Sequence, residues 1–233
     1  MSIAIAGTHT NIGKTFLSAC MIAKYGKFKN LFYWKPIQTG SSTDTDSDTH
    51  WILKYSGADP EFVFPPAYTL SFPSSPDYAA WLEGREISLD RVVEEFKFRH
   101  SYANRNGGIL LIELAGGVYV PWNDKKTTLD FLKEVQIPVL LAVSMELGTI
   151  NHSLLTIEAC KVREIPVLGF IGFSFHNSIS LVWESSAKSI ERFSMVPCLG
   201  SYSIGREFSI EDFRTWAERN FDPENQIGSL LNS

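Results

Sequence analysis

Cysteine is scarce in this sequence of 233 residues, which contains only Cys20, Cys160 and Cys198. An odd number of cysteines at wide spacings, with no CxxC pair, supports neither a disulfide framework nor a zinc site. The longest apolar runs, such as residues 137–143, are far shorter than the ~20 residues that a membrane-spanning helix needs. The N-terminal residues also lack the basic region and apolar core of a secretory signal. These absences predict a cytoplasmic protein that does not enter a membrane.

The sequence also lacks an excess of positive charge. It has 21 lysines and arginines against 26 aspartates and glutamates, which gives a formal net charge of −5. A general binder of nucleic acid or of anionic membranes would present a basic face, so this balance argues against both partners. The hydrophobic share of 44% and the charged share of 20% are ordinary for a globular chain. No change in composition marks a linker, and we expect a single domain over residues 1–233.

Short apolar runs alternate with longer amphipathic segments along the chain. This alternation predicts βαβ units and a single-domain, doubly wound α/β fold whose mainly parallel sheet is flanked by helices. The expected strands are Ile3–Ala6, Leu31–Lys35, Ile109–Glu113, Val139–Ser144, Val167–Phe173 and Met195–Cys198. The expected helices are Lys14–Tyr25, Leu89–Tyr102, Leu129–Glu134, Asn151–Arg163, Ser180–Arg192 and Ser209–Glu218. The polar residues 41–48 and the proline-rich residues 62–76 are expected to be a loop and an irregular connection.

The most informative segment is Gly7–Thr15 (GTHTNIGKT), which directly follows the first expected strand. A strand, a turn and a helix that begins at Gly-Lys-Thr place backbone N–H groups and the positive end of a helix dipole around an anion. Lys14 would neutralise phosphate oxygens, and the Thr15 hydroxyl would reach a magnesium ion. The first glycine lies one residue earlier than in the usual GxxxxGK[ST] pattern. The alternative is a turn that binds no phosphate and uses Gly13 only as a conformational hinge.

A second clue is the apolar strand at residues 109–113, which ends in Glu113 and precedes Gly116 and Gly117. In phosphate-loop enzymes an acid at such a strand end lies beside the phosphates and holds magnesium, directly or through water. The two glycines permit close approach of the backbone to a ligand. The alternative is a glutamate that ends its strand in contact with solvent, which is common. The presence of the phosphate loop in the same sequence favours metal binding over this alternative.

Several further short motifs follow the loop in an order known from one enzyme family. They are Lys35–Gly40 (KPIQTG), Ser47–Asp48, Pro73–Pro76 (PSSP), Glu113–Gly117 (ELAGG) and Leu147–His152 (LGTINH). Together with the loop they resemble, in order and spacing as far as about Gly200, the motifs of the dethiobiotin synthetase family. Several independent motifs in the right order are far more specific than a phosphate loop alone.

The resemblance implies a phosphate-loop NTPase fold and an ATP-dependent carbon–nitrogen ligase of biotin biosynthesis. Its substrates would be 7,8-diaminononanoate, carbon dioxide and ATP, with Mg²⁺ as the metal. One amine would capture carbon dioxide as a carbamate, the γ-phosphoryl group would activate it as a carbamic–phosphoric anhydride, and the other amine would close a cyclic urea. The resemblance also implies a homodimer with active sites near the subunit interface.

The resemblance assigns roles to residues of this sequence. The catalytic set is Lys14, Lys35 and Thr10. The nucleotide-binding set is Asn11, Ile12, Gly13, Lys14, Thr15, Phe16, Glu113, Gly116 and Phe173. The substrate-binding set is Thr10, Lys35, Thr39, Gly117, Gly148, Thr149, Ile150 and Asn151. The metal-binding set is Thr15, Asp48 and Glu113, whose oxygen donors suit Mg²⁺.

Ordinary structural roles compete with some of these assignments. Without the family motif, Lys35 would be interpreted as a solvated lysine after a strand, and Asp48 as a solvated acid in a polar loop. Asn151 has the alternative role of a helix N-cap. His152 is expected to be structural, because the sequence shows no acid or base partner beside it.

The sequence departs from the family pattern at several positions. His9 and Asn11 remove negative charge beside the phosphates, and Asp77 stands where histidine is common. Leu114 replaces a glycine, which would be unfavourable if the backbone needs a positive φ there. Phe173 stands in place of an asparagine that often reads the adenine edge, and a phenyl ring can stack on a base but cannot supply paired hydrogen bonds. We therefore expect relaxed use of nucleoside triphosphates.

Three other functions stay open on the sequence alone. The first is a related phosphate-loop enzyme that amidates a different acid, although the 233 residues contain no glutamine-hydrolysing domain. The second is a nucleotide switch or partitioning ATPase, which would commonly carry an extra lysine where this chain has Thr8, His9 and Thr10. The third is a degenerate homologue that binds ligand without turnover, an option that Leu114 and Phe173 keep open. Residues 218–233 show no evident role.

Overall fold

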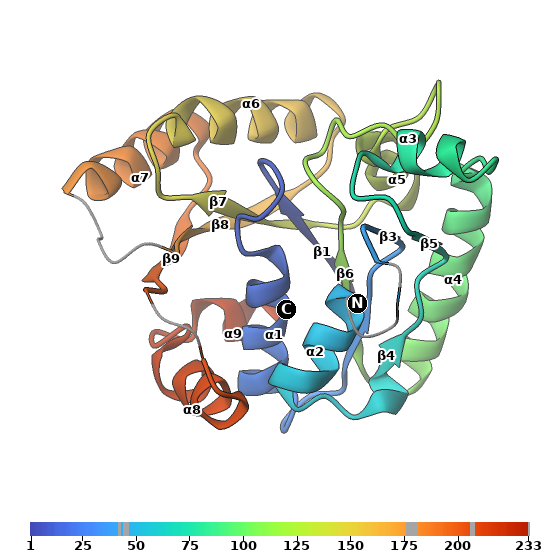
Figure 1. The fold of residues 1–233 in the computed structure, drawn as a ribbon. Coiled ribbons are helices and arrows are strands. Elements are labelled where there is room, and N and C mark those ends of the chain that lie inside the picture. The colour runs from blue at the N-terminus through green and yellow to red at the C-terminus, as the bar shows by residue number, and fades with distance from the viewer. Residues whose placement is uncertain (42, 44–46, 176–180, 206–207, 233) are drawn as a thin grey trace.

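A computed structural model describes residues 1–41, 43, 47–175, 181–205 and 208–232 of the chain. Seven parallel strands form the main sheet in the order β4-β2-β6-β1-β7-β8-β9, and β3 pairs with β5 in a second, small sheet (Figure 1). The strands are β1 Ser2–Gly7, β2 Leu31–Trp34, β3 Ile37–Thr39, β4 Val63–Phe64, β5 Tyr68–Leu70, β6 Ile109–Glu113, β7 Val139–Ser144, β8 Val167–Ser174 and β9 Cys198–Ser203. The helices are α1 Lys14–Tyr25, α2 Asp48–Ser56, α3 Pro76–Leu82, α4 Leu89–Arg105, α5 Thr128–Val135, α6 Thr149–Val162, α7 Leu181–Ser194, α8 Ile210–Asn220 and α9 Gln226–Leu230. The prediction of a doubly wound, mainly parallel sheet is confirmed.

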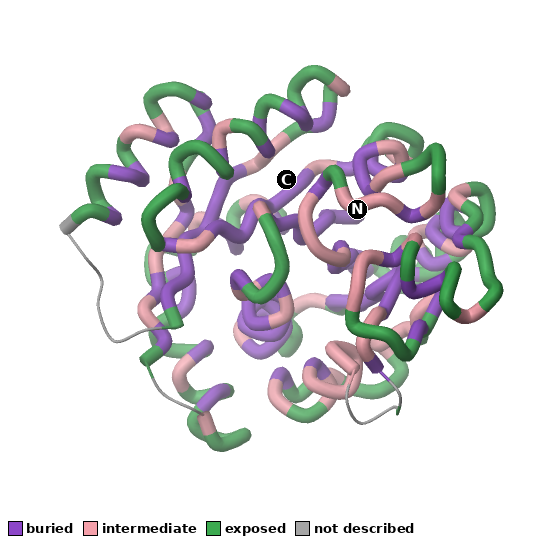
Figure 2. The backbone as a smooth tube through the Cα atoms, turned by 45° about the horizontal axis from the view of Figure 1, so that its top comes forward, coloured by how far each residue is buried: buried purple, intermediate pink, exposed green. Residues whose placement is uncertain are grey.

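Alternate residues of the central strands face opposite layers of helices. Ile3 and Ile5 of β1 belong to one apolar cluster, which includes residues of α1 and α8. Ala4 and Ala6 belong to a second cluster, which includes residues of α3 to α7. Figure 1 shows α1, α2, α8 and α9 gathered on one side of the sheet, and in Figure 2 the middle of the molecule is buried. The strands β1, β2 and β6 are buried at every residue, whereas the edge strands β4 and β9 are only partly buried. A sheet covered on both faces explains why its strands read as continuous apolar runs.

Strand β1 lies at the centre of the sheet, between β6 and β7. From β1 the chain runs to β2 on one side and returns through β6, and the strands from β7 onward extend the sheet on the other side. In open α/β sheets, ligands bind at the carboxyl ends of the strands where the direction of winding changes. The loop after β1 and the end of β6 meet at this point, because Ile5 is in register with Glu113.

The last strand differs from its prediction. The sequence predicts a strand over Met195–Cys198, whereas β9 runs from Cys198 to Ser203. Met195 follows α7 in a left-handed conformation with a φ of 58°, so the chain turns at this residue instead of extending. The predicted boundaries are therefore wrong, although a strand does follow α7.

Two segments that the sequence predicts to be irregular contain regular structure. In residues 41–48, of which 42 and 44–46 lie outside the described residues, helix α2 begins at Asp48. The Ser47 hydroxyl caps this helix by accepting a hydrogen bond from the backbone N–H of His50 at 3.1 Å. Residues 62–76 contain β4 and β5 and lead into α3. A serine before an acidic first turn is a helix-start signal, but the polar composition around it favoured a loop.

The segment after α8 holds the far end of α1 in place. Asp222 is 1% exposed and accepts hydrogen bonds from the Tyr25 hydroxyl and, at 2.9 Å, from the backbone N–H of Gly228. Lys24 donates to the carbonyl oxygen of Asp222 at 2.9 Å. The helix that follows the loop at residues 7–15 is thus fastened at its C-terminal end by a segment whose role the sequence did not reveal.

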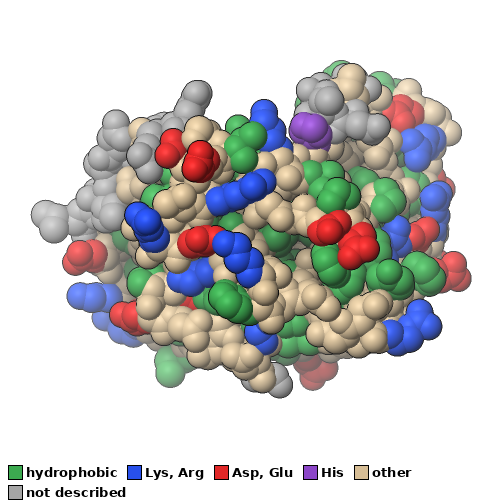
Figure 3. All heavy atoms as spheres, turned by 90° about the horizontal axis from the view of Figure 1, so that it is seen from below, with side chains coloured by type: hydrophobic (Ala, Val, Ile, Leu, Met, Phe, Trp, Pro, Cys, Tyr) green, Lys and Arg blue, Asp and Glu red, His purple; other side chains and the backbone are tan. Residues whose placement is uncertain are grey.

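No helix in the described part of the chain is both long and apolar enough to span a membrane. On the face shown in Figure 3, acidic and basic side chains intermingle, with apolar side chains between them. This face therefore presents no large field of one sign to a charged partner.

Candidate active site

The loop between β1 and α1 has the geometry of a phosphate-binding loop. Gly13 precedes α1 with a φ of 101°, a left-handed conformation that glycine adopts without strain. A Cβ atom at Gly13 would lie 2.9 Å from the ring of Phe173, so a side chain would also collide there. Lys14 is 6% exposed, and its Nζ donates to the carbonyl oxygen of His9 at 2.7 Å. The ammonium group is thereby held against the loop at the N-terminus of α1.

Two carboxylates from distant parts of the sequence meet beside this loop. Glu113, at the end of β6, is fully buried, and its Oε1 accepts from the Thr15 hydroxyl at 2.7 Å and from Lys35 Nζ at 3.1 Å. The Thr15 hydroxyl shares its single proton between this oxygen and Asp48 Oδ1, which lies 2.9 Å away. Asp48 also accepts from the same ammonium group at 2.5 Å. Neither Asp48 nor Lys35 is therefore a freely solvated side chain, and the structure brings the three predicted metal ligands together.

Two hydroxyl groups that the sequence did not point to hold the other oxygen of Glu113. The Tyr33 hydroxyl donates to Glu113 Oε2 at 3.0 Å, and the Ser18 hydroxyl donates to it at 3.2 Å. Burial and the nearby Glu113 carboxylate raise the pKa of Tyr33 well above its ordinary value, so its hydroxyl stays a donor. In the sequence both residues look like ordinary core positions, and only the pairing of β2 with β6 brings Tyr33 to the carboxylate.

These groups surround a cavity of about 400 Å³ at the carboxyl edge of the sheet. Its lining residues are Thr10, Asn11, Gly13, Lys14, Thr15, Phe16, Lys35, Gln38, Thr39, Asp48, Trp51, Glu113, Ala115, Gly116 and Phe175. Most of the predicted catalytic, nucleotide-binding and metal-binding residues are therefore neighbours. The residues that sequence analysis did not select are Gln38, Trp51, Ala115 and Phe175. Trp51 carried a usable signal, because it lies one turn after the Ser47 cap on a short helix beside the predicted Asp48.

Phe173 does not line the cavity, contrary to the expectation that its ring stacks on a base. It is 2% exposed and packs beneath Gly13 and against Phe16, with ring centroids 5.6 Å apart. Phe175 lines the cavity instead and is 42% exposed. The difference arises because Phe173 lies inside β8 under the loop, whereas Phe175 follows the end of that strand.

Three residues near the loop pack against the surrounding protein: Ile12, Gly117 and Leu114. Ile12 is 3% exposed and packs against Gly7, and a Cβ atom at Gly117 would lie 3.0 Å from the carbonyl oxygen of Thr8. Leu114 is 1% exposed and does not have a positive φ. The leucine at position 114 therefore introduces no backbone strain, and the nearby position that needs glycine is Gly116, whose φ is 61°.

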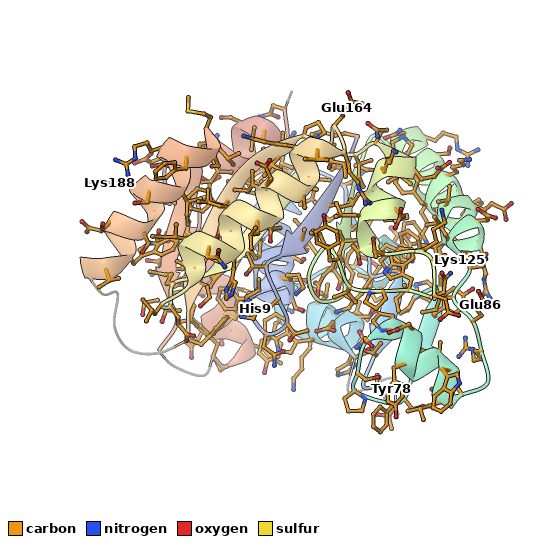
Figure 4. The ribbon with its side chains drawn as sticks, turned by 90° about the horizontal axis from the view of Figure 1, so that it is seen from above. His9, Tyr78, Glu86, Lys125, Glu164 and Lys188 are labelled. Atoms are coloured by element: carbon orange, nitrogen blue, oxygen red, sulfur yellow. The ribbon has the colours of Figure 1, made fainter. Side chains whose placement is uncertain are left out.

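Residues 148–151, expected to bind the substrate carboxylate, lie at the start of α6 and do not line this cavity. The N-cap of α6 is Gly148, with a φ of 96°, so Asn151 lies inside the first turn and is not the cap. The ring of His152 lies edge-on to the ring of His9, with centroids 6.2 Å apart. Figure 4 shows His9 at the tip of the phosphate loop, near the beginning of α6. The start of α6 thus adjoins the loop from outside the cavity.

The two lysines of the cavity have opposite electrostatic environments. Burial and the neighbouring Lys35 charge lower the pKa of Lys14 to about 8. Burial also disfavours the charge of Lys35, but Glu113 and Asp48 outweigh that effect and raise the pKa of Lys35. Burial likewise acts against the Asp48 carboxylate, but Lys35 outweighs it, and the pKa of Asp48 is lowered. Among the described residues Lys14 forms no ion pair, so it is a buried cation to which a phosphate group would supply an anion.

The oxygen donors of Thr15, Asp48 and Glu113 fit a hard divalent cation. Mg²⁺ prefers carboxylate and hydroxyl oxygens and usually binds through one or two carboxylates together with waters and substrate phosphates. Over the described ranges, no group of three His, Cys, Asp or Glu side chains gathers into a metal cluster. The two carboxylates and one hydroxyl therefore suit an ion that arrives with phosphate groups better than one held by the protein alone.

Comparison with known proteins agrees with this geometry. The AAA domain family model matches residues 1–203. A protein of Leptospira interrogans named ATP-dependent dethiobiotin synthetase BioD is 35% identical over 233 residues, which cover 99% of this chain and 100% of that protein. The chain belongs to the dethiobiotin synthetase family. Another member, from Brucella abortus, is 34% identical over 218 residues, which cover 91% of this chain and 96% of its own length.

Solved structures with low sequence identity share the fold of this dethiobiotin synthetase family member. The MinC:MinD cell division complex of Aquifex aeolicus aligns with a TM-score of 0.57 and 14% identity, covering 100% of this chain and 96% of that chain. A ParA family ATPase from Chlorobium tepidum aligns with a TM-score of 0.55 and 10% identity, covering 93% and 96%. At these identities the likeness concerns the fold alone, and it supports the phosphate-loop NTPase architecture.

We predict that nucleotide binding weakens as the pH rises through 8. The protonated form of Lys14 binds phosphate, and its pKa of about 8 in the free protein means that most molecules lose this charge as the pH passes that value. A binding constant proportional to the protonated fraction falls about tenfold between pH 7 and pH 9. Isothermal titration calorimetry with ADP in the absence of metal measures this fall.

The matched control for this titration is Lys14→Arg, because a guanidinium group stays protonated over the whole range. Its affinity for ADP should change less than about twofold between the same two pH values. A wild-type affinity that is constant from pH 7 to pH 9 would show that Lys14 is not the titrating cation.

Proposed function

We propose that the chain is an ATP- and Mg²⁺-dependent dethiobiotin synthetase that acts on 7,8-diaminononanoate and carbon dioxide and closes a cyclic urea. The observation that carries this proposal is the convergence of two buried lysines and an all-oxygen cation site at one cavity beside a phosphate loop. The lysines are Lys14 and Lys35, and the oxygen donors are Thr15, Asp48 and Glu113. Family membership over nearly the whole chain supports the choice of reaction. Residues 1–233 act as one domain in it.

The two lysine cations of the cavity suit a reaction in which one anion, a carbamate, attacks another, the triphosphate. One amine of the substrate attacks carbon dioxide and loses a proton to form a carbamate. A carbamate oxygen then attacks the γ-phosphorus and ADP leaves. The second amine attacks the activated carbonyl carbon, the C–O bond to phosphate breaks, and the nitrogen loses a proton as the urea forms and phosphate leaves. The carbamate and the triphosphate repel each other, so cations are needed to bring them together and to stabilise the charge that spreads during transfer.

The positions of the cations support the catalytic roles that we assign. Lys14, which is buried without an ion pair, binds the phosphates. Lys35, which bridges Asp48 and Glu113 in the same cavity, is the cation that we assign to the carbamate as it approaches the γ-phosphoryl group. The hydroxyl groups of Thr10 and Thr39 line the same cavity and orient the substrate. Thr15, Asp48 and Glu113 would hold Mg²⁺, which would neutralise part of the phosphate charge during transfer.

We infer that the nucleotide base lies against the aromatic side of the cavity. Trp51 and Phe175 line it together with Phe16. Stacking on aromatic rings tolerates every base, because every base has a π face. The amide of Gln38 is already engaged, since its Nε2 donates to the carbonyl oxygen of Thr39 at 2.9 Å and its Oε1 accepts from the backbone N–H of Asp48 at 3.2 Å. This arrangement supports relaxed base selection.

We further propose a homodimer in which the start of α6 from one subunit binds the substrate carboxylate beside the cavity of the other. Gly148, Thr149, Ile150 and Asn151 are the residues of this helix start. A helix N-terminus favours an anion, and in this chain the start of α6 does not line its own cavity. Leu147 is 96% exposed and Leu155 is 61% exposed, so α6 and the residue before its cap present apolar side chains for a second copy to cover.

The remaining parts of the proposal concern partners and location. The partners are small molecules and the second subunit, with no role for nucleic acid or a membrane. Cys20, Cys160 and Cys198 are free thiols in the structure, in keeping with the reducing cytoplasm in which we place the protein.

The decisive assay measures phosphate release from ATP with Mg²⁺ and bicarbonate, with and without 7,8-diaminononanoate, and reads the product mass in the same tubes. We expect diamine-dependent release and one cyclic urea per phosphate. Release that does not depend on the diamine would indicate a nucleotide switch or a different acid substrate. No release from a folded protein that still binds nucleotide would indicate a homologue without turnover.

The control variant for this assay is Lys14→Ala. We expect it to lose at least about 100-fold in turnover, because a cation aimed at developing phosphate charge is removed. Its thermal stability should not fall, because the free protein buries this lysine without an ion pair. Full activity in the folded variant would disprove the assignment of the phosphate loop.

We predict that CTP and GTP support turnover within about tenfold of ATP in kcat/KM, because stacking on Trp51 and Phe175 discriminates weakly between bases. Trp51→Ala should raise the KM for all three nucleotides by about tenfold. Trp81→Ala, at an exposed tryptophan outside the cavity, is the matched control and should leave each KM unchanged. A preference for ATP above about 100-fold contradicts recognition by stacking.

For the dimer we predict that Leu155→Glu gives a monomer by light scattering and lowers turnover at least about tenfold, because a charge is placed in an apolar contact between subunits. Phe98→Glu is the matched control, since Phe98 on α4 is 62% exposed against 61% for Leu155. A monomeric wild-type protein with full activity, or an unchanged dimer in Leu155→Glu, contradicts this interface.

A further inference from the structure

The two oxygens of the Glu113 carboxylate lie in different environments. Oε1 accepts hydrogen bonds from Thr15 and Lys35, which line the cavity. Oε2 accepts from Ser18 and Tyr33, which do not line it. The side chain is fully buried, so water does not satisfy either oxygen from outside. The carboxylate is therefore held in one orientation, with one oxygen toward the cavity and one toward the interior.

Tyr33 is the stronger of the two interior donors. The Ser18 hydroxyl has a single proton, and it lies 3.0 Å from the carbonyl oxygen of Lys14 as well as 3.2 Å from Glu113 Oε2, so that proton is shared. In the described part of the chain, the Tyr33 hydroxyl has Glu113 as its one hydrogen-bond partner, at 3.0 Å. Tyr33 is itself fully buried on β2, directly beside β6, so its ring has a fixed position relative to the carboxylate.

This orientation matters because rotation about the last bond of a glutamate side chain is soft. Without a donor on Oε2, the carboxylate is free to turn and to present either oxygen, or both, to the cavity. Groups that hydrogen-bond a metal ligand commonly set its orientation and affect metal affinity strongly. The hydroxyl of Tyr33 is such a group, although it lines neither the cavity nor the phosphate loop.

We propose that Tyr33 is a positioning residue that holds Glu113 Oε2, so that Glu113 presents Oε1 alone to the metal that accompanies the nucleotide. This inference rests on the proposed metal-dependent function, because it gives Glu113 the role of a metal ligand. Tyr33 does not touch substrate, and it acts through the orientation of Glu113.

The chain contains a matched comparison for this role. Tyr25 is a second buried tyrosine whose hydroxyl donates to a buried carboxylate, that of Asp222, with Asn225 Oδ1 as a more distant acceptor at 3.4 Å. This pair lies at the far end of α1 and outside the cavity. Tyr25→Phe and Tyr33→Phe therefore remove the same chemical group from the same kind of contact, and only the second contact orients a proposed metal ligand.

The experiment titrates Mn²⁺ into the full-length protein in the presence of saturating ADP, follows the EPR signal, and subtracts a titration without protein. We expect Tyr33→Phe to raise the Mn²⁺ dissociation constant of the ternary complex at least about tenfold. Tyr25→Phe should lower the melting temperature by a similar amount but leave this constant unchanged. In the activity assay, Tyr33→Phe should raise the Mg²⁺ concentration for half-maximal rate and regain most of its kcat at saturating Mg²⁺.

Ser18→Ala provides a second, smaller perturbation of the same oxygen, with an expected rise of about threefold because its proton is shared. It carries the test if Tyr33→Phe does not fold. An unchanged Mn²⁺ constant in the folded variants, with the loss of stability also seen in Tyr25→Phe, would mean that Tyr33 only satisfies a buried charge and would overturn the proposal. Failure of the proposed function looks different, because the wild-type protein itself would then bind no Mn²⁺ beyond that bound by ADP alone.

Discussion

The fully buried charge of Glu113 is the constraint on which the site depends. A buried carboxylate is strongly unfavourable unless cations and hydrogen-bond donors compensate it. Tyr33 comes from β2, Ser18 from α1, and Lys35 from the residue after β2. Their bonds to Glu113 tie these elements to the end of β6, so the shape of the cavity follows from the way in which one charge is satisfied.

The two lysines of the cavity are both buried, but only one of them has its charge compensated by carboxylates. Lys35 is paired with two carboxylates, which compensate its buried charge. Lys14 is as deeply buried but has a carbonyl oxygen as its hydrogen-bond partner, which leaves its desolvation largely uncompensated. The free energy lost there in the free protein is regained when an anion arrives. Part of the affinity for phosphate thus comes from relieving the unfavourable burial of Lys14.

The sequence predicted some parts of this site and not others, for physical reasons. The loop with Lys14 and the strand ending in Glu113 were predictable, because short apolar runs end there in chemically distinctive residues. Tyr33 was not, because an aromatic residue in an apolar strand looks like core until the neighbouring strand is known. The end of β8 decides whether Phe173 or Phe175 reaches the cavity, and strand ends are weakly encoded in local sequence. The position of α6 relative to the cavity depends on tertiary packing alone.

The bond between Tyr25 and Asp222 joins residues 197 positions apart in the chain. Closing a loop of this length costs little more conformational entropy than closing a shorter one, because the cost rises only with the logarithm of the loop length. Helix α1, which begins at the phosphate loop, therefore depends for its position on a segment far away in the sequence. A substitution that loosens the contacts of Asp222 would reach the nucleotide site through α1, although Asp222 does not line the cavity.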